Sequence, residues 1–156
     1  MKNILLIGGS TGIGYELSQK LKEDNNLFIA TRDKEKFNDT NIKTKDLNLN
    51  HEFETDWLPD HIDGFVYLPG TINLRPFKGL KPSVFLEDFK INVMGCVEIL
   101  QKVLPKIQAA KNPSIVMFST VAVKLGMPFH SSVSSSKGAI EGLTRALAAE
   151  FAPKIR

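Results

Sequence analysis

The chain carries the stretch Gly8-Gly9-Ser10-Thr11-Gly12-Ile13-Gly14 directly after an apolar run, Ile4-Leu5-Leu6-Ile7, and before a helical pattern. This order predicts a strand, a glycine turn and a helix in succession. Gly8 allows a sharp exit from the strand, Gly12 opens the backbone to a pyrophosphate, and Gly14 lets the helix pack close to the sheet. The free N–H groups of a helix N-terminus favour phosphate. The stretch therefore predicts a dinucleotide site, and a tight turn without a ligand is the alternative.

Length and composition limit the class of protein. The 156 residues fit one domain, and a hydrophobic content of 42% with 24% charged residues is usual for a globular chain. The net charge of +3 is small and spread out, so we expect no nucleic acid partner. No apolar run reaches transmembrane length, and glycines cut the first run short. We therefore expect no membrane partner, no signal peptide and a cytoplasmic location.

Cysteine and histidine show no metal-ligand pattern. The single cysteine, Cys96, lies in a helical apolar pattern, which predicts a core residue in a reducing compartment. His51, His61 and His130 are far apart and have no ligand-like spacing with Cys96, so we expect no metal site. No Cys/His or Ser/His/Asp arrangement for nucleophilic catalysis stands out either.

Apolar strands alternate with helical patterns along the rest of the chain. Strands are expected over 4–7, 27–30, 42–47, 65–68 and 114–118. Helices are expected over 13–22, 84–110 and 132–151, with short helical segments over 32–36 and 56–59 and a kink at Pro105. Strands that are apolar throughout indicate a parallel sheet covered on both faces. Right-handed crossovers then predict a three-layer, doubly wound α/β fold of about five strands.

In such a sheet a ligand lies at the carboxyl ends of the strands, so the residues after the strands are the candidate site. Thr31 and Arg32 come after the second strand, where a guanidinium could pair with a cofactor 2′-phosphate. The alternative is a solvated arginine. Asp46 and Leu47 come after the third strand and could border an adenine pocket, although a turn carboxylate is as good an interpretation.

The next two strands add further candidates. Gly70 comes after the fourth strand and leaves bare backbone against which a flat nucleotide could lie. Ser119 and Thr120 end the fifth strand with two hydroxyls that either face the same crevice or cap the next segment of the chain.

Lys137 lies near the start of the last predicted helix, where the helix dipole disfavours a cation. A lysine there could hold a cofactor ribose, and an exposed lysine is the alternative. The same helix carries a small-residue stripe that permits close packing, within the chain or across a dimer axis: Gly138, Gly142, Ala146 and Ala149.

Together these residues resemble the short-chain dehydrogenase/reductase family over essentially the whole chain, which implies a Rossmann fold. Gly8, Gly12 and Gly14 match the family's three-glycine cofactor turn. Asp46 matches the family's acidic residue beside the adenine, and Asn92 matches the helix asparagine of the family's four catalytic residues. Thr120 stands at the position of the catalytic serine. Residues 135–150 are similar to the stretch after the family's catalytic tyrosine. The expected cofactor-binding residues are thus Gly8, Ser10, Thr11, Gly12, Ile13, Gly14, Thr31, Arg32, Asp46, Leu47, Gly70 and Lys137.

The chain departs from the family at the catalytic tyrosine. In the family's Tyr-x-x-x-Lys motif the tyrosine falls four residues before the lysine, where this chain has Val133. In the family's mechanism a hydride moves from nicotinamide to a carbonyl carbon while the tyrosine protonates the oxygen, and a valine cannot donate a proton. Tyr67 stands where the first asparagine of the Asn-Asn-Ala-Gly motif is expected, and of that motif only Gly70 is retained.

The family also has a sixth strand, a substrate-covering segment and a seventh strand after the position of Arg156. We therefore expect one NAD(P)-binding domain over 1–156 that lacks these parts, either a shortened natural chain or a segment that stops at the last helix.

The resemblance implies an oxidoreductase that transfers a hydride between NADP(H), with NAD less favoured, and a small carbonyl or alcohol substrate. It implies a homodimer or homotetramer, and activity impaired by Val133. A catalytically inactive NADP(H)-binding protein, acting as a sensor or an assembly subunit, is the alternative. An α/β interaction module that binds no nucleotide is a third interpretation.

Overall fold

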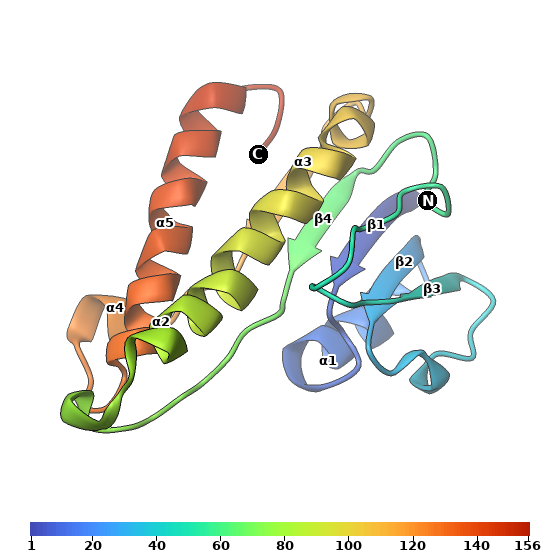
Figure 1. The fold of residues 1–156 in the computed structure, drawn as a ribbon. Helices are drawn as coiled ribbons and strands as arrows, with labels where there is room; N and C mark the ends of the chain where they lie inside the picture. The colour runs from blue at the N-terminus through green and yellow to red at the C-terminus, as the bar shows by residue number, and fades with distance from the viewer.

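Five parallel strands form the centre of the chain, which a computed structural model describes over residues 1–156 (Figure 1). The strands lie in the order β3-β2-β1-β4-β5, so the order reverses between β1 and β4. In sheets of this type ligands bind at that reversal, outside the carboxyl ends of the strands. The strand bounds are Lys2–Ile7 (β1), Asn25–Thr31 (β2), Ile42–Asp46 (β3), Gly64–Tyr67 (β4) and Ser114–Met117 (β5).

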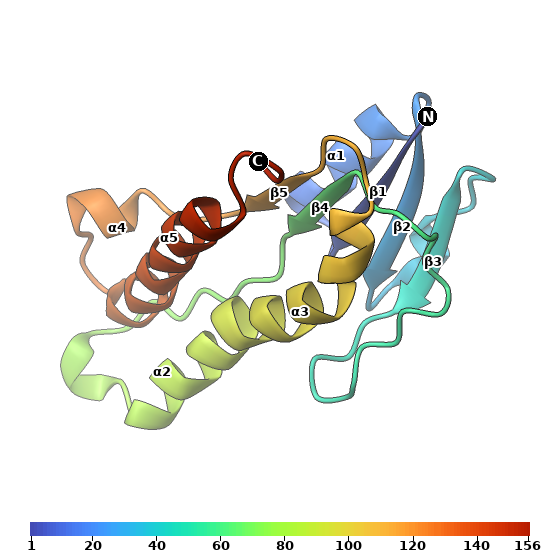
Figure 2. The same cartoon turned by 90° about the horizontal axis from the view of Figure 1, so that it is seen from above.

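Helices cover both faces of the sheet. Figures 1 and 2 show α1 on one side and α3 with α5 on the other, which confirms the predicted doubly wound, three-layer fold. A π-helical segment, Lys90–Met94, joins α2 to α3. The helix bounds are Gly12–Leu21 (α1), Pro82–Phe89 (α2), Gly95–Gln108 (α3), Ala122–Leu125 (α4) and Ser131–Phe151 (α5), with short 3-10 helices at Lys34–Lys36 and Phe77–Gly79.

Alternate side chains of β1 enter two separate cores. Leu5 and Ile7 pack in the larger core with residues of α3, among them Cys96, which is fully buried as its helical pattern predicts. Leu6 packs in the smaller core beneath α1, together with Ile29 of β2. Because apolar residues are needed on both faces, the central strands are apolar at nearly every position.

Several elements differ from the predicted ones. The irregularity in the long helix is the π-helical segment Lys90–Met94, whereas Pro105 lies inside α3 without breaking it. Residues 56–59 form a turn, not a helix, and there the Trp57 indole N–H donates to the Glu54 carbonyl at 3.0 Å. The four-residue helix α4 was not predicted. Segments of about four residues are too short for a helical period to decide.

The last residue pairs with the free edge of β5. The Arg156 N–H donates to the Pro113 carbonyl at 3.1 Å, and the Ile115 N–H donates to the Arg156 carbonyl at 2.8 Å. This is the bond pattern of a parallel ladder. Arg156 is therefore tied to the edge of β5 by two backbone hydrogen bonds, and Ile155 before it packs in the larger core.

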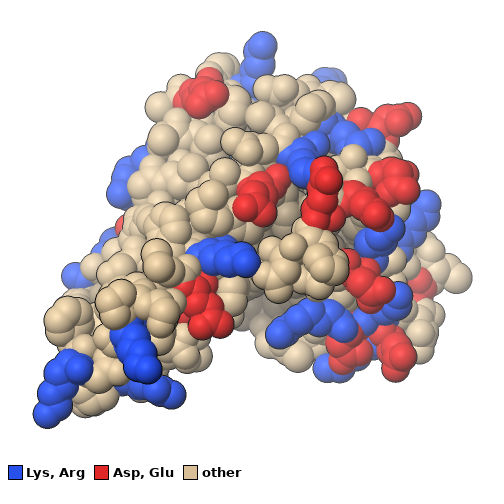
Figure 3. All heavy atoms as spheres, in the orientation of Figure 1, with Lys and Arg blue, Asp and Glu red and all other residues tan.

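Charges of both signs alternate on one side of the molecule. Figure 3 shows basic and acidic residues interspersed over the β2 and β3 side, whereas the charges near α4 and the start of α5 are mostly basic. The opposite signs are paired there, with Lys34 at 2.7 Å from Asp46 and Lys45 at 2.6 Å from Glu54.

Candidate nucleotide-binding and active site

A cleft of about 940 Å³ lies at the carboxyl ends of the strands. It is lined by the glycine turn, by the residues that come after β2, β3 and β4, and by Lys137 of α5. Every expected cofactor-binding residue except Gly12 lines it. The topology thus brings together residues that the sequence separates by more than a hundred positions.

The glycine turn has the backbone geometry that its sequence predicts. Gly8 and Gly12 have φ values of +75° and +55°, which side-chain-bearing residues rarely adopt. A Cβ on Gly14 would lie 2.7 Å from the Cα of Gly9, so this position requires the close approach that only glycine permits. A Cβ on Gly12 would meet no atom within 4 Å. Gly8 therefore allows the turn after β1, and Gly14 allows α1 to pack closely against that turn.

The N-terminus of α1 is free to bind an anion. Its N-cap residue, Thr11, makes no side-chain capping hydrogen bond. The N–H groups of the first turn therefore have no partner from the cap, and the helix dipole adds a partial positive charge there. A pyrophosphate suits these donors.

Cationic side chains stand beside the glycine turn. Arg32 is exposed and lines the cleft directly after β2. The Lys36 amine donates to the Ser10 carbonyl at 3.1 Å and lies 3.2 Å from the Asp33 carboxylate. Thr31, in contrast, is 1% exposed. Asp46 lines the cleft but is paired with Lys34.

Lys137 is almost buried at the inner end of the cleft. It is 9% exposed, and burial lowers the pKa of its amine, an effect that the nearby Cys96 opposes. No carboxylate pairs with it. Val133 lies one turn earlier on the same helix and is 5% exposed. Lys137 therefore lines the cleft from α5, and Val133 one turn before it is a packed aliphatic side chain.

Asn92 is fully buried within the π-helical segment, a type of helix irregularity that is frequent at functional sites. Its amide nitrogen donates to the Thr71 hydroxyl at 2.9 Å and to the Asp88 carbonyl at 2.8 Å. Its amide oxygen has no hydrogen-bond partner. A Cβ built on Gly70 would lie 3.2 Å from this oxygen and 3.4 Å from the Lys137 amine. Both atoms therefore face one small space beside Gly70.

The two hydroxyls after β5 are engaged within the chain. The Thr120 hydroxyl accepts from the Ala122 N–H at 3.3 Å, at the start of α4, and the Ser119 hydroxyl donates to Glu141 at 2.7 Å. Ser119 lines the cleft and Thr120 does not. The Thr120 hydroxyl thus contacts the first residue of α4, the helix whose N-cap is Val121.

Sequence reasoning missed a buried acidic residue behind the cleft. Asp88 of α2 is fully buried and accepts hydrogen bonds from Thr71, Asn73 and Ser132. The available signal was its place in a helix that is otherwise apolar on its inner side. None of these three donors to its carboxylate lies near it in sequence, so the pattern alone does not gather them.

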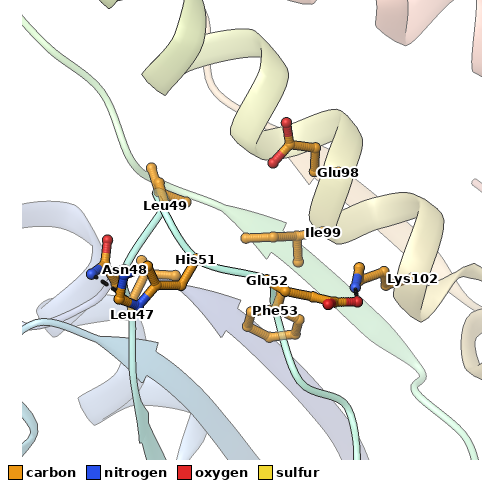
Figure 4. Close-up of a pocket in the computed structure, with 9 residues that line it drawn as sticks. All are labelled: Leu47, Asn48, Leu49, His51, Glu52, Phe53, Glu98, Ile99 and Lys102. Atoms are coloured by element: carbon orange, nitrogen blue, oxygen red, sulfur yellow. Dashed lines mark hydrogen bonds and ion pairs between the residues drawn. The ribbon is translucent and has the colours of Figure 1, made fainter.

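A smaller cavity of about 320 Å³ lies between α3 and the loop after β3 (Figure 4). Lys102 and Glu52 point toward one another and form an ion pair that ties the loop to the helix. Lys102 also holds the pKa of the Glu52 carboxyl below its usual value. The loop residues 47–49 line both this cavity and the main cleft, so the ion pair supports one wall of the candidate site.

The fold is a doubly wound α/β sheet with a cleft at the carboxyl ends of its strands. The family model for short chain dehydrogenases matches residues 2–156, so the chain belongs to this family. Its members are oxidoreductases that bind a nicotinamide cofactor and act on small molecules. None of the helices is long and apolar enough to cross a membrane.

Curated relatives match the chain at low identity. The 3-ketodihydrosphingosine reductase of Bacteroides thetaiotaomicron is 24% identical over 96% of this chain and 58% of its own length. Dehydrogenase/reductase SDR family member 6 of Danio rerio is 26% identical over 96% of this chain and 65% of its own length. The chain thus spans about three fifths of the length of these relatives.

Solved structures share the fold. A short chain dehydrogenase from Shigella flexneri 2a, complexed with NADP, has a TM-score of 0.90 at 22% identity. The match covers 99% of this chain and 74% of the Shigella chain. A short-chain dehydrogenase/reductase from Brucella melitensis has a TM-score of 0.88 at 23% identity, covering 99% of this chain and 69% of its own.

Proposed function

We propose that the chain binds NADP(H) in the cleft at the carboxyl edge of the sheet. The observation that carries this proposal is the convergence of the uncapped N-terminus of α1 with Arg32 and Lys36. The helix N-terminus would hold the pyrophosphate, and Arg32 would pair with the 2′-phosphate of the adenosine ribose. The residues present fit this cofactor, because Gly8, Gly9 and Gly14 add no side chain to this wall of the cleft.

The residues after β2 favour NADP over NAD. A cofactor without the 2′-phosphate usually meets a carboxylate that accepts from the ribose 2′-hydroxyl. Here the first residues after β2 are Arg32 and then Asp33, whose carboxylate is engaged by Lys36. Arg32 is available to pair with a 2′-phosphate, and the Asp33 carboxylate is already paired with Lys36. Both features favour binding of the phosphorylated ribose of NADP(H).

The bound cofactor would supply hydride chemistry toward a small carbonyl or alcohol. Lys137 would hold a ribose hydroxyl, and its burial strengthens that contact by excluding water. No tyrosine stands beside it to protonate the substrate oxygen. The Tyr67 hydroxyl cannot replace it, because Tyr67 is buried and donates to the Ile91 carbonyl. We therefore infer an oxidoreductase with impaired hydride transfer.

A second candidate is an inactive NADP(H)-binding protein that acts as a sensor or an assembly subunit, and the packed Val133 favours it. In either case we propose one NAD(P)-binding domain over residues 1–156, a cytoplasmic location, and assembly as a homodimer or homotetramer. The small-residue stripe on α5 supports the assembly.

A cofactor titration tests the proposal. Nicotinamide fluorescence should saturate with NADPH, and NADH should bind about tenfold or more weakly. Gly12→Asp would place a carboxylate at the proposed phosphate site and should abolish NADPH binding. Gly126→Asp is a matched control, because Gly126 has a similar φ of +65° and also has open space at its Cβ, in the loop after α4. Absence of NADPH binding, or equal loss in both variants, would overturn the proposal.

A further inference from the structure

A buried polar network lies directly behind Asn92. The Asp88 carboxylate at its centre is fully buried and has no ion-pair partner. Its Oδ1 accepts from the Thr71 hydroxyl and from the Asn73 amide, the latter at 2.7 Å, and its Oδ2 accepts from the Ser132 hydroxyl. These donors come from the loop after β4 and from the start of α5. The carboxylate thus joins three elements that surround the cleft.

The direction of each hydrogen bond is set by the carboxylate. The Thr71 hydroxyl donates to Oδ1 of Asp88, so its single hydrogen is committed to that oxygen. The Thr71 oxygen can then only accept from Asn92, which must present its NH₂ group at 2.9 Å. The second hydrogen of that NH₂ group goes to the Asp88 carbonyl at 2.8 Å. The network therefore fixes the amide orientation of Asn92 without reference to the cleft.

This orientation leaves the Asn92 oxygen on the side of Lys137. The oxygen has no partner within the chain, and it faces the same space beside Gly70 as the Lys137 amine. Thr71 and Gly70 both line the cleft. An acceptor and a cation that share one small space fit a hydroxyl group, because a hydroxyl can donate to the oxygen while it accepts from the amine.

We propose that Asp88 is a positioning residue which, through Thr71 and through its own backbone carbonyl, holds the Asn92 oxygen toward Lys137 and so prepares this end of the cleft for a ligand hydroxyl. That this hydroxyl is a ribose group of NADP(H) rests on the proposed function. The orientation of Asn92 is independent of the proposed function, because it rests on hydrogen bonds within the chain.

Thr71 offers the sharpest test, because Thr71→Val keeps its shape and removes only the hydroxyl. Without that acceptor the NH₂ group of Asn92 keeps only its bond to the Asp88 carbonyl. The amide is then held less firmly, and turned states that present NH₂ to Lys137 disfavour the ammonium. We expect NADPH to bind roughly fivefold to tenfold more weakly. We also expect the pKa of the Lys137 amine to fall. That pKa can be followed by NMR on lysine-labelled protein without cofactor, with the signal assigned through Lys137→Arg.

Conservative variants separate positioning from general damage. Thr71→Ser keeps the hydroxyl and should retain both the NADPH affinity and the Lys137 pKa. Asp88→Asn should also retain them, because its amide oxygen can face Thr71 and Asn73 while its NH₂ group faces Ser132, whose hydroxyl can reverse. Asp88→Leu removes both carboxylate oxygens and keeps the backbone carbonyl of residue 88, so the Thr71 hydroxyl loses its fixed direction and the variant should behave like Thr71→Val. If Asp88→Leu does not fold, Thr71→Val decides.

The outcomes distinguish the two proposals. A Lys137 pKa that is unchanged in folded Thr71→Val overturns the positioning role, whatever the cofactor does. A shifted pKa in a protein that binds no NADPH upholds the positioning role and overturns the proposed function.

Discussion

The Tyr67 hydroxyl donates a 2.6 Å hydrogen bond to the carbonyl oxygen of Ile91. The π-helical segment explains the need for this bond, because the Gly95 N–H donates to Lys90, five residues back, and not to Ile91, four residues back. Burial raises the pKa of Tyr67, so the hydroxyl keeps its proton. A Cβ on Gly95 would lie 2.6 Å from the Tyr67 oxygen. A residue at a motif position of the family thus stabilises the helix that carries Asn92.

This relationship predicts that substitutions at Tyr67 and Gly95 are coupled. Tyr67→Phe should lower the free energy of unfolding by about 1 to 3 kcal/mol, because it leaves the Ile91 carbonyl short of a donor. Gly95→Ala should cost about 1 to 3 kcal/mol through overpacking against the hydroxyl. In the double variant the clash is relieved, so the combined loss should be smaller than the sum of the two. Urea unfolding of all four proteins measures this difference, and strict additivity would contradict it.

Arg32→Ala should weaken NADPH binding about tenfold and leave NADH binding unchanged, because a charge-assisted pair with the 2′-phosphate is lost. The preference for NADPH should disappear with it. Arg145→Ala is a suitable control, since Arg145 is exposed on α5 and lies 3.7 Å from Glu141, outside the cleft. Nicotinamide fluorescence titrations measure both affinities. An unchanged preference for NADPH in Arg32→Ala would show that another group reads the ribose.

Much of the fold could be predicted from periodicity. The five strands and the three long helices are indicated by apolar runs and helical spacing, and Gly8 marks the end of β1. The π-helical segment Lys90–Met94 could not be predicted, because inserting one residue into a helical turn leaves the apolar spacing nearly intact. Segments of about four residues, such as α4, carry too little pattern to be assigned.

The part of the candidate site that lies at the carboxyl ends of the strands could be predicted from the order of strands and helices. Residues at the ends of parallel strands gather at one edge, so Arg32, Asp46 and Gly70 could be placed together without coordinates. The Asp88 network was not predictable in this way. Its members lie inside helices or in a long loop, and their meeting depends on helix rotation that only the packed structure fixes.

The stripe on α5 predicts a subunit interface. Gly142, Ala146 and Ala149 are exposed, and a Cβ on Gly142 would meet no atom of its own chain within 4 Å. Gly142→Glu should therefore leave the subunit folded and dissociate the oligomer. Gly79→Glu is a matched control, because Gly79 also has open space at its Cβ and lies in a 3-10 helix, outside the stripe. Light scattering that shows a monomer of the unaltered protein at high micromolar concentration would contradict the prediction.

Lys137 predicts a particular dependence of stability on pH. Burial lowers the pKa of its amine in the folded protein below the ordinary value of 10.5, so the unfolded chain binds more protons between these two values. The free energy of unfolding therefore rises with pH across that window. Lys137→Met has no titrating amine at this position and lacks this contribution. The free energy of unfolding of the unaltered protein should therefore rise relative to that of Lys137→Met as the pH increases. Urea unfolding at several alkaline pH values measures it, and a constant difference would contradict the burial of a charged amine.

Val133→Tyr should increase carbonyl reduction by the chain. Val133 lies one helical turn before Lys137, so a tyrosine there can share its face of α5 and use the lysine to lower its pKa. General acid catalysis contributes roughly 10²-fold to 10⁴-fold in rate, so a trace activity should become measurable as loss of NADPH absorbance with an aromatic aldehyde. Adding Lys137→Met to Val133→Tyr should remove most of the gain, which separates proton donation from a change in packing. A contradicting outcome is an unaltered protein that already reduces carbonyls at about 1 to 10³ per second. The proton for the substrate oxygen would then come from another donor. His130 and a water molecule held by Thr120 would then be the next groups to substitute.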